Sequence, residues 1–250
     1  MWHGVLGGRV RERLVLLTLV VAVVSLTVAI AVRWMYTGYG PFLTLFEILL
    51  SNLFSLGLIF LVVYWFVPGA RPGALVVLPI LLMIGIWAAN ESPLPGRLPA
   101  TYDSALLWIH VIIGKLFLGI CLAAVGLAGV LLLRRLFGAG GFLGSMPADY
   151  VLDALVWKFI SAAFIFHSGM LIVGAVWAQD AWGRYWDWDP LETWAFITWL
   201  AMGLSLHARV SCKLSQSMGW LMVLVIFTLA FLTFFGVPFS SLGPHKGVLQ

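Results

Sequence analysis

The sequence predicts an all-α, polytopic membrane protein whose spans form a transmembrane helical bundle. Of its 250 residues, 62% are hydrophobic and only 10% are charged, and the mean hydropathy is +1.06. Soluble domains are about 45–50% apolar and about 25% charged. The net charge of +4 is small and lies mainly at the ends of apolar runs. It therefore indicates membrane topology, and no nucleic-acid partner is expected.

The apolar runs predict about seven spans, each close to the roughly 20 residues that a helix needs to cross the hydrocarbon core. Pro72 and Pro79 interrupt the third run, but neighbouring helices in a bundle can satisfy the carbonyls that a proline frees. The first run is longer than the roughly 7–15 residues of a signal-peptide core, so we expect an uncleaved first span. The expected spans cover residues 13–34, 42–66, 73–90, 106–133, 153–178, 191–209 and 216–236.

The distribution of Lys and Arg favours an N-terminus on the inner side, because cytoplasmic loops are enriched in basic residues. The inner side would then hold Arg9, Arg11, Arg13, Arg71, Arg134, Arg135, Arg209 and Lys213. The outer side would hold Arg33, Arg97, Arg184 and Lys246. This orientation places the 91–105 loop, the C-terminal tail and the Trp-rich loop outside. The Gly-rich loop 136–150 would be a flexible inner connector.

The segment 177–199, WAQDAWGRYWDWDPLETWAFITW, is a polar and aromatic stretch between two apolar runs. Trp favours the headgroup level of a membrane, so the segment is expected to lie at the surface and to offer flat aromatic faces to a ligand. Asp189 followed by Pro190 and Glu192 predicts a helix start with a capping box. Trp182 and Trp186 would share a face if that piece were helical.

Four histidines lie in or beside the expected spans. His110 and His245 fall on the side of the Trp-rich segment, where two imidazoles could bind the iron of a porphyrin. The alternative is a pair of interfacial histidines bonded to water or backbone. His207 lies at the inner end of the sixth span, where it could instead satisfy free helix carbonyls. His167 lies mid-span and could bond a neighbouring helix.

Other residues bear on redox chemistry and on charge within the membrane. Cys121 and Cys212 are not expected to form a disulfide, and the sequence holds no CxxC or CxxCH motif, so no covalent heme attachment to this chain is expected. Lys115 is expected to reach outward along its apolar stem, and it could also meet an anionic ligand. Glu47 is expected to face the bundle.

The stretch WGRYWDWDPLETWAFITW resembles the Trp-rich "WWD" signature of heme-handling proteins of cytochrome c maturation. The resemblance is to the CcsA (ResC-like) membrane subunits of the system II machinery. SALLWIHV around His110 and FGVPFSSLGPHKG around His245 resemble the family's two outer histidine segments. FLTLFEILL resembles a further family segment, and His167 matches none of the family's ligands.

This resemblance implies one heme-handling transmembrane domain over residues 1–250, with an external heme-binding segment at 177–199. Heme b would bind non-covalently at the outer, periplasmic or lumenal face of a bacterial inner membrane or thylakoid-type membrane. His110 and His245 would be its axial ligands, and His207 would bind a second heme within the membrane. The residues proposed to contact the porphyrin or its propionates are Trp182, Trp186, Trp188, Arg184 and Asp189.

The resemblance also implies partners besides membrane lipid. A ResB/CcsB-like membrane protein would supply the other transmembrane ligand, and apocytochrome c would receive the heme in a heme lyase/synthase-type reaction. The alternatives are a CcmC-like subunit that passes heme to a chaperone, a heme b electron-transfer subunit and a structural assembly subunit. The DPLETWAF form of the motif and His207 favour the first assignment. His167 and His207 make a poor cytochrome b pair.

Overall fold

The computed structural model describes residues 2–138, 140–212 and 214–236, with side chains from Val10 onward. These residues are arranged in helices and connecting loops, which confirms the predicted all-α class. The α-helices are α1 (Trp2–Thr37), α2 (Leu45–Phe66), α3 (Ala74–Asn90), α4 (Ala105–Phe137), α5 (Gly141–Gly144), α6 (Asp149–Trp182), α7 (Pro190–Ser211) and α8 (Gln216–Phe231). Short helical turns are η1 (Pro68–Gly73), η2 (Ala100–Tyr102) and the π-helical η3 (Leu232–Gly236).

Six helical segments in the described chain are long and apolar enough to cross a membrane. They correspond to six of the seven predicted spans and are Val10–Thr37, Leu45–Phe66, Pro68–Asn90, Ala105–Phe137, Asp149–Trp182 and Gln216–Gly236. The seventh, α7, is 22 residues long but is not among them. Its sequence carries several polar side chains, from Glu192 to Arg209, which lower its hydropathy. That α7 crosses the membrane stays a prediction.

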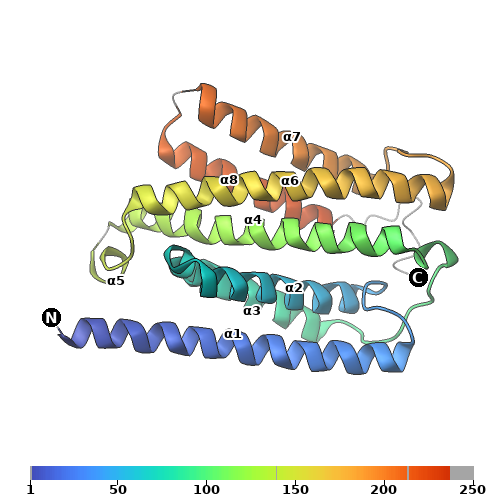
Figure 1. Ribbon diagram of the computed structural model, residues 1–250, viewed down its shortest axis with the longest axis horizontal. Coiled ribbons are helices and arrows are strands. Elements are labelled where there is room, and N and C mark those ends of the chain that lie inside the picture. Colours follow the sequence, from blue (N-terminus) through green and yellow to red (C-terminus); the bar gives the residue numbers. More distant parts are fainter. Residues whose placement is uncertain (1, 139, 213, 237–250) are drawn as a thin grey trace.

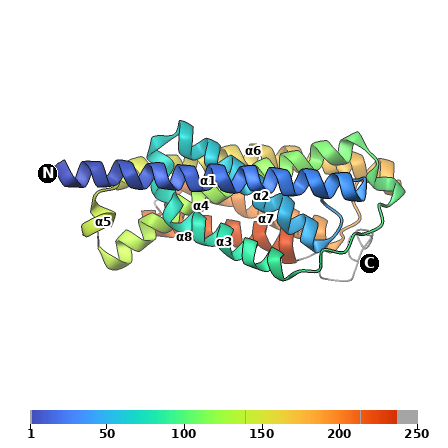
Figure 2. The ribbon, with the colours of Figure 1, turned by 90° about the horizontal axis from the view of Figure 1, so that it is seen from below.

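The long helices lie side by side along the long axis of the molecule and alternate in direction (Figures 1 and 2). The α1–α2, α3–α4 and α6–α7 connections meet at one end, which we call the Trp-rich end (residues 38–44, 91–104 and 183–189). The other end, the basic end, carries η1, α5 and the α7–α8 turn. The basic end holds Arg11, Arg13, Arg71, Arg134, Arg135 and Arg209. Which end faces the cytoplasm stays a prediction.

Helix α4 is the centre of the bundle and packs against α2, α3, α6 and α8. In its most apolar stretch 72% of the residues are buried, against 11% for α1, which packs on α2 at the edge. Glycines on α4 allow the neighbouring helices to approach it closely. A Cβ at Gly119 would lie 2.5 Å from Ile59 Cδ1, and one at Gly126 would lie 2.7 Å from Val77 Cγ2. Small residues at such crossings are typical of membrane helix packing.

Two ionisable side chains inside the bundle form hydrogen bonds with neighbouring helices. The Glu47 carboxylate, fully buried, accepts hydrogen bonds from Arg33 at 2.8 and 3.0 Å, as expected for a bundle-facing carboxyl. The outward course predicted for Lys115 is wrong, because its Nζ donates to Ser51 Oγ at 3.1 Å and to Asn52 Oδ1 at 3.2 Å on α2. Two polar partners inside the bundle replace the headgroup region that the lysine would otherwise seek.

Candidate functional site

The Trp-rich segment forms a turn between two helices. Helix α6 ends at Trp182, because Gly183 adopts a left-handed conformation (φ 76°) and donates to Gln179 O at 2.9 Å. Helix α7 begins at Pro190 after Asp189, whose carboxylate accepts the Glu192 N–H at 2.8 Å. The predicted helix start is therefore confirmed.

The capping box expected at this helix start is absent, and the helical piece that would place Trp182 and Trp186 on one face does not form. The Glu192 side chain does not close a capping box on Asp189; its carboxylate accepts the Asp187 N–H at 2.7 Å instead. Trp182 and Trp186 do not share a helical face, since Gly183 ends the helix between them. Asp187 and Asp189 are instead both held by Glu192, which fixes the segment before α7.

His110 lies near the first turns of α4, at the Trp-rich end, and is half-buried against α6. Its Nδ1 lies 2.9 Å from Met170 O. A carbonyl oxygen only accepts, so Nδ1 carries a proton, and in the neutral ring the lone pair is then on Nε2. The ring stacks on Trp177, with centroids 6.4 Å apart and planes at 21°. Trp177 is 4% exposed and donates its indole N–H to Thr101 O at 3.2 Å.

A group of aromatic side chains continues from Trp177 across the Trp-rich end. Trp182 packs edge-on against Trp177 at 4.7 Å, and Tyr102 does so at 5.7 Å. Phe42 joins Tyr102 at 6.4 Å and Trp108 at 4.8 Å. Sequence reasoning missed Tyr102 and Phe42 because they lie on the α3–α4 and α1–α2 connections. The signal that could have found them is the same end-of-span position that selected His110.

A second aromatic group follows Gly183 and is more accessible. Trp186 and Trp188 pack edge-on at 5.8 Å, and both contact Phe196. Trp188 is 67% exposed and has a positive φ of 57°, which is uncommon for a bulky side chain and persists only where the surrounding structure fixes the backbone. The indole nitrogen of Trp186 is buried without a hydrogen-bond partner among the described residues.

The charged members of the predicted site differ in exposure. The Arg184 side chain is 60% exposed and forms an ion pair with Asp187. Asp189 is only 5% exposed and caps α7. Burial, with the nearby Asp189 carboxylate as a second cause, raises the pKa of Tyr102 to about 12. The Asp189 carboxylate is thus an inward-facing group shared between α7 and the α3–α4 connection.

The sequence matches a known protein family over most of its length. The profile described as "Cytochrome C assembly protein" matches residues 11–245. The chain belongs to the cytochrome c assembly protein family. It is similar to the "Cytochrome c biogenesis protein CcsA" of Nicotiana tomentosiformis, with 27% identity over 91% of this chain and 83% of the relative. The CcsA of Arabidopsis thaliana is 24% identical over 91% and 84%.

This cytochrome c assembly protein is also similar to the CcsA of Panax ginseng, with a higher identity over a shorter segment. There the identity is 41% over 95 residues, which is 38% of this chain and only 30% of the relative's length. The family and its biogenesis setting are therefore shown. The activity, substrates and partners of the whole relatives are carried over only as proposals.

Two further histidines of this cytochrome c assembly protein, His207 and His245, were predicted to bind heme iron. His207 is near the end of α7 at the basic end, and it is exposed. It shares its face of α7 with Leu200 and Leu204, which are 48% and 65% exposed, so this face points away from the bundle. His245 lies outside the described residues. The described residues hold no cluster of three or more His, Cys, Asp or Glu that could bind a metal ion.

His167 is a core residue of this cytochrome c assembly protein. It is fully buried, its Nε2 donates to Ala195 O at 3.0 Å, and Phe117 packs edge-on at 4.1 Å. This contact leaves no space beside the ring for a porphyrin. The expectation of a bond to a neighbouring helix is confirmed.

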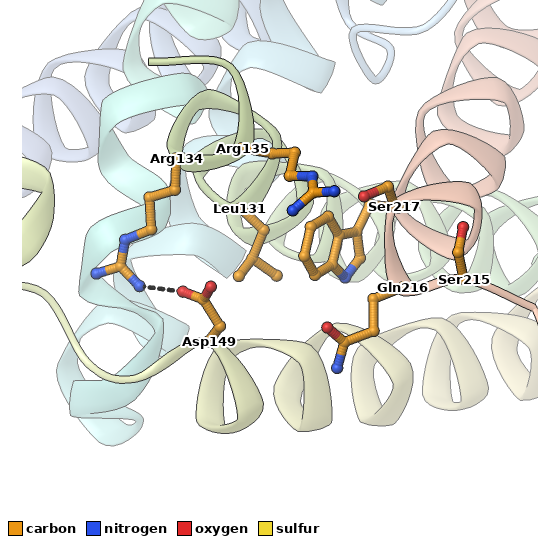
Figure 3. A pocket seen from close by; sticks show the side chains of 8 residues that line it. Leu131, Arg134, Arg135, Asp149, Ser215, Gln216 and Ser217 are labelled. Atoms are coloured by element: carbon orange, nitrogen blue, oxygen red, sulfur yellow. Dashed lines mark hydrogen bonds and ion pairs between the residues drawn. The ribbon is translucent and has the colours of Figure 1, made fainter. Parts of the chain in front are cut away.

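A hollow at the basic end is separate from these residues (Figure 3). Arg134 borders it and donates to Asp149 at 2.6 Å, Leu143 O and Pro147 O. The predicted flexible connector is thus tied to α4 by one arginine. The hollow is lined by Leu131, Arg134, Arg135, Asp149, Ser215, Gln216, Ser217 and Trp220, none of them a predicted site residue.

Proposed function

We propose that this chain holds heme b non-covalently at its Trp-rich end and presents it to apocytochrome c for thioether attachment. Membership of the cytochrome c assembly family supports this setting. The single observation that carries the proposal is the state of His110. Its Nδ1–H is committed to Met170 O at 2.9 Å beside the Trp-rich segment, which leaves Nε2 as the ligating nitrogen.

The residues at the Trp-rich end suit a porphyrin. The indole of Trp188 is exposed, Trp186 is half-buried against it, and Trp182 is half-buried against Trp177, so the segment provides aromatic faces at low conformational-entropy cost. The exposed Arg184 guanidinium matches the geometry of a propionate. Asp189 caps the N-terminus of α7 and so fixes the end of the segment where that helix begins. We propose His245 as the second axial ligand.

The chemistry that this arrangement would support is mainly positioning. His110 and His245 would hold the iron through their imidazoles, and iron held by both would not bind dioxygen. Each thiol of an apocytochrome CxxCH segment then adds across a vinyl group: the sulfur bonds one vinyl carbon and the thiol proton goes to the other, so no oxidant is needed. The chain contributes by holding the vinyl groups beside the incoming thiols. We assign the heme lyase/synthase-type activity to a complex with a ResB/CcsB-like partner.

We further propose a second heme position at His207. Its face of α7 carries the exposed Leu200 and Leu204 and points away from this chain's own bundle. A second iron ligand would therefore come from another membrane protein, and a ResB/CcsB-like partner fits that role. Heme would pass from this position to the Trp-rich end, which we place on the outer side of a bacterial inner membrane or a thylakoid-type membrane.

The CcsA name of the relatives favours this function over the CcmC-like one. A CcmC-like subunit would need no ligand at the position of His207. The number of hemes bound per chain distinguishes the CcsA-like function from the CcmC-like one. His207→Ala should remove one heme from the chain purified with its partner, whereas an unchanged count would sink the inner position.

The outer position is tested in cells that depend on this chain for cytochrome c assembly. His110→Ala and His245→Ala should each abolish covalently bound heme in c-type cytochromes, because each removes an axial ligand. His3→Ala is the matched control, since it removes a histidine from the N-terminal segment, and it should behave as wild type. Full cytochrome c assembly in both His110→Ala and His245→Ala would refute the outer site.

A further inference from the structure

The imidazole of His110 rests on one face of α6. Met170, Gly174 and Trp177 are spaced by four and three residues, so they line the same side of that helix. Met170 accepts the Nδ1–H bond through its carbonyl at 2.9 Å, and Trp177 stacks on the ring. Gly174 lies between them along the helix and faces the ring, since a Cβ added there would point at the imidazole. A main-chain group, rather than a side chain, thus sets the protonated nitrogen of His110.

Gly174 is the residue that permits this contact. A Cβ at this position would lie 2.7 Å from both Cε1 and Nδ1 of His110, closer than real Cβ contacts allow. The imidazole is attached close to α4 and has few rotatable bonds, so relief of the clash would displace the ring from Met170 O. Gly169 on the same helix differs, because a Cβ there would meet Ile113 Cγ2 at an ordinary 3.7 Å.

We propose that Gly174 is a positioning residue for heme binding. It lets α6 approach His110 closely enough for the Met170 carbonyl to hold the Nδ1–H tautomer and the ring angle, so that Nε2 is presented to iron. When a histidine binds a metal, a hydrogen bond donated by its other ring nitrogen orients the ring and raises the basicity of the ligating nitrogen. This inference rests on the proposed function, because it assumes that His110 binds the iron.

The test compares Gly174→Ala with Gly169→Ala, His110→Ala and wild type in the purified full chain, titrated with hemin and reduced. Gly169→Ala should match wild type in hemin affinity, low-spin alpha band and midpoint potential. Gly174→Ala should bind hemin about 10- to 100-fold more weakly, the usual loss when the outer partner of a metal ligand is removed. Its midpoint potential should also rise, because an imidazole without the N–H···O bond donates less to ferric iron.

The outcomes separate the inference from the proposed function. If His110→Ala loses the low-spin band while Gly174→Ala keeps wild-type affinity and potential, the inference is wrong and the proposed function stands. If His110→Ala binds hemin as wild type does, the proposed function itself fails. A weaker affinity of Gly174→Ala with an unchanged potential would also overturn the inference, since it would indicate a packing defect only.

A second measurement needs no variant of Gly174. The ¹⁵N shifts of histidine-labelled protein without hemin, with the His110 signals assigned by their loss in His110→Ala, report which ring nitrogen is protonated. We expect Nδ1 to be protonated and Nε2 not. A protonated Nε2 with an unprotonated Nδ1 would overturn the inference, whatever the stability of Gly174→Ala.

Discussion

Asp189 illustrates how a residue beside the site can serve the fold. Its carboxylate accepts the Glu192 N–H at 2.8 Å and is almost fully buried, so its first role is to start α7. The sequence predicted this role, because Asp before Pro at a helix start is a local signal. A contact between Asp189 and a porphyrin stays a prediction.

The two roles of Asp189 can be separated by substitution. Asp189→Ala removes the cap and should lower the free energy of unfolding by about 1 kcal/mol, measured by thermal denaturation in detergent. Asp189→Asn keeps a capping side chain and should retain most of that stability. If hemin binding falls in Asp189→Asn while stability is kept, the charge has a role beyond the cap.

Tyr102 makes stability depend on alkaline pH. Burial, helped by the Asp189 carboxylate, raises its pKa from 10.0 to about 12, so between these values the folded chain keeps a proton that the unfolded chain has lost. Stability should therefore fall as pH rises from 10 to 12. The loss approaches about 2–3 kcal/mol at the upper limit. Tyr102→Phe should remove this component, and an unchanged alkaline profile would contradict the buried placement.

The histidines show what sequence could predict at the residue scale. The position of His110 near the start of the fourth span predicted that it lies at the Trp-rich end, because the length of a spanning helix fixes how far each residue lies from its ends. It could not reveal Met170 and Gly174 as its neighbours, since these depend on how α4 and α6 are rotated about their axes. For the same reason Glu47 was assigned to the interior without its partner Arg33.

At the scale of elements, three helices meet at the basic end around one carboxylate. Asp153 on α6 is buried; it accepts from Arg209 on α7 at 2.6 Å and from Trp220 on α8 at 2.8 Å. Arg209 also lies over the Trp157 ring at 5.2 Å. This cluster fixes the end of α7 that carries His207.

Loss of this carboxylate should destabilise the bundle. Asp153→Ala leaves the buried Trp220 indole N–H without its acceptor and should cost about 2–3 kcal/mol. Asp187→Ala is the control, because it breaks the exposed pair with Arg184 and should cost less than about 1 kcal/mol. Equal melting temperatures for the two variants would contradict the three-helix cluster.

The element boundaries were predicted well where apolar length decides them and less well where the chain turns. The six candidate spans follow the apolar runs closely. The turn after Trp182 was not predicted, because Gly183 and the Glu192–Asp187 bond override the helical spacing of Trp182 and Trp186. Composition alone does not mark α7 as a span, because it carries polar side chains such as Thr198 and Arg209, which make contacts within the bundle.

At the scale of the whole molecule, charge divides the two ends. Among the described residues, the basic end carries more arginines than the Trp-rich end, which holds Arg33, Arg97 and Arg184. This asymmetry favours a cytoplasmic basic end. In that orientation His110 and the Trp-rich segment would lie on the face where we propose that apocytochrome c is met.

The native cysteines allow a direct test of this orientation. Cys212 is exposed in the α7–α8 turn, and Cys121 is fully buried, so labelling should report Cys212 alone. A membrane-impermeant maleimide should label Cys212 only after the cells are opened. With Cys212→Ser as background, Tyr185→Cys at the Trp-rich end should react in intact cells. The reverse pattern would invert the topology and remove the outer heme position.

The central claim is that His110 binds heme iron at the Trp-rich end, and pulsed EPR tests it most directly. The full chain, labelled with ¹⁵N-histidine and loaded with hemin, should show hyperfine coupling from two histidine nitrogens to low-spin ferric iron. His110→Ala should lose one of these couplings. Retention of both couplings in His110→Ala would contradict the account.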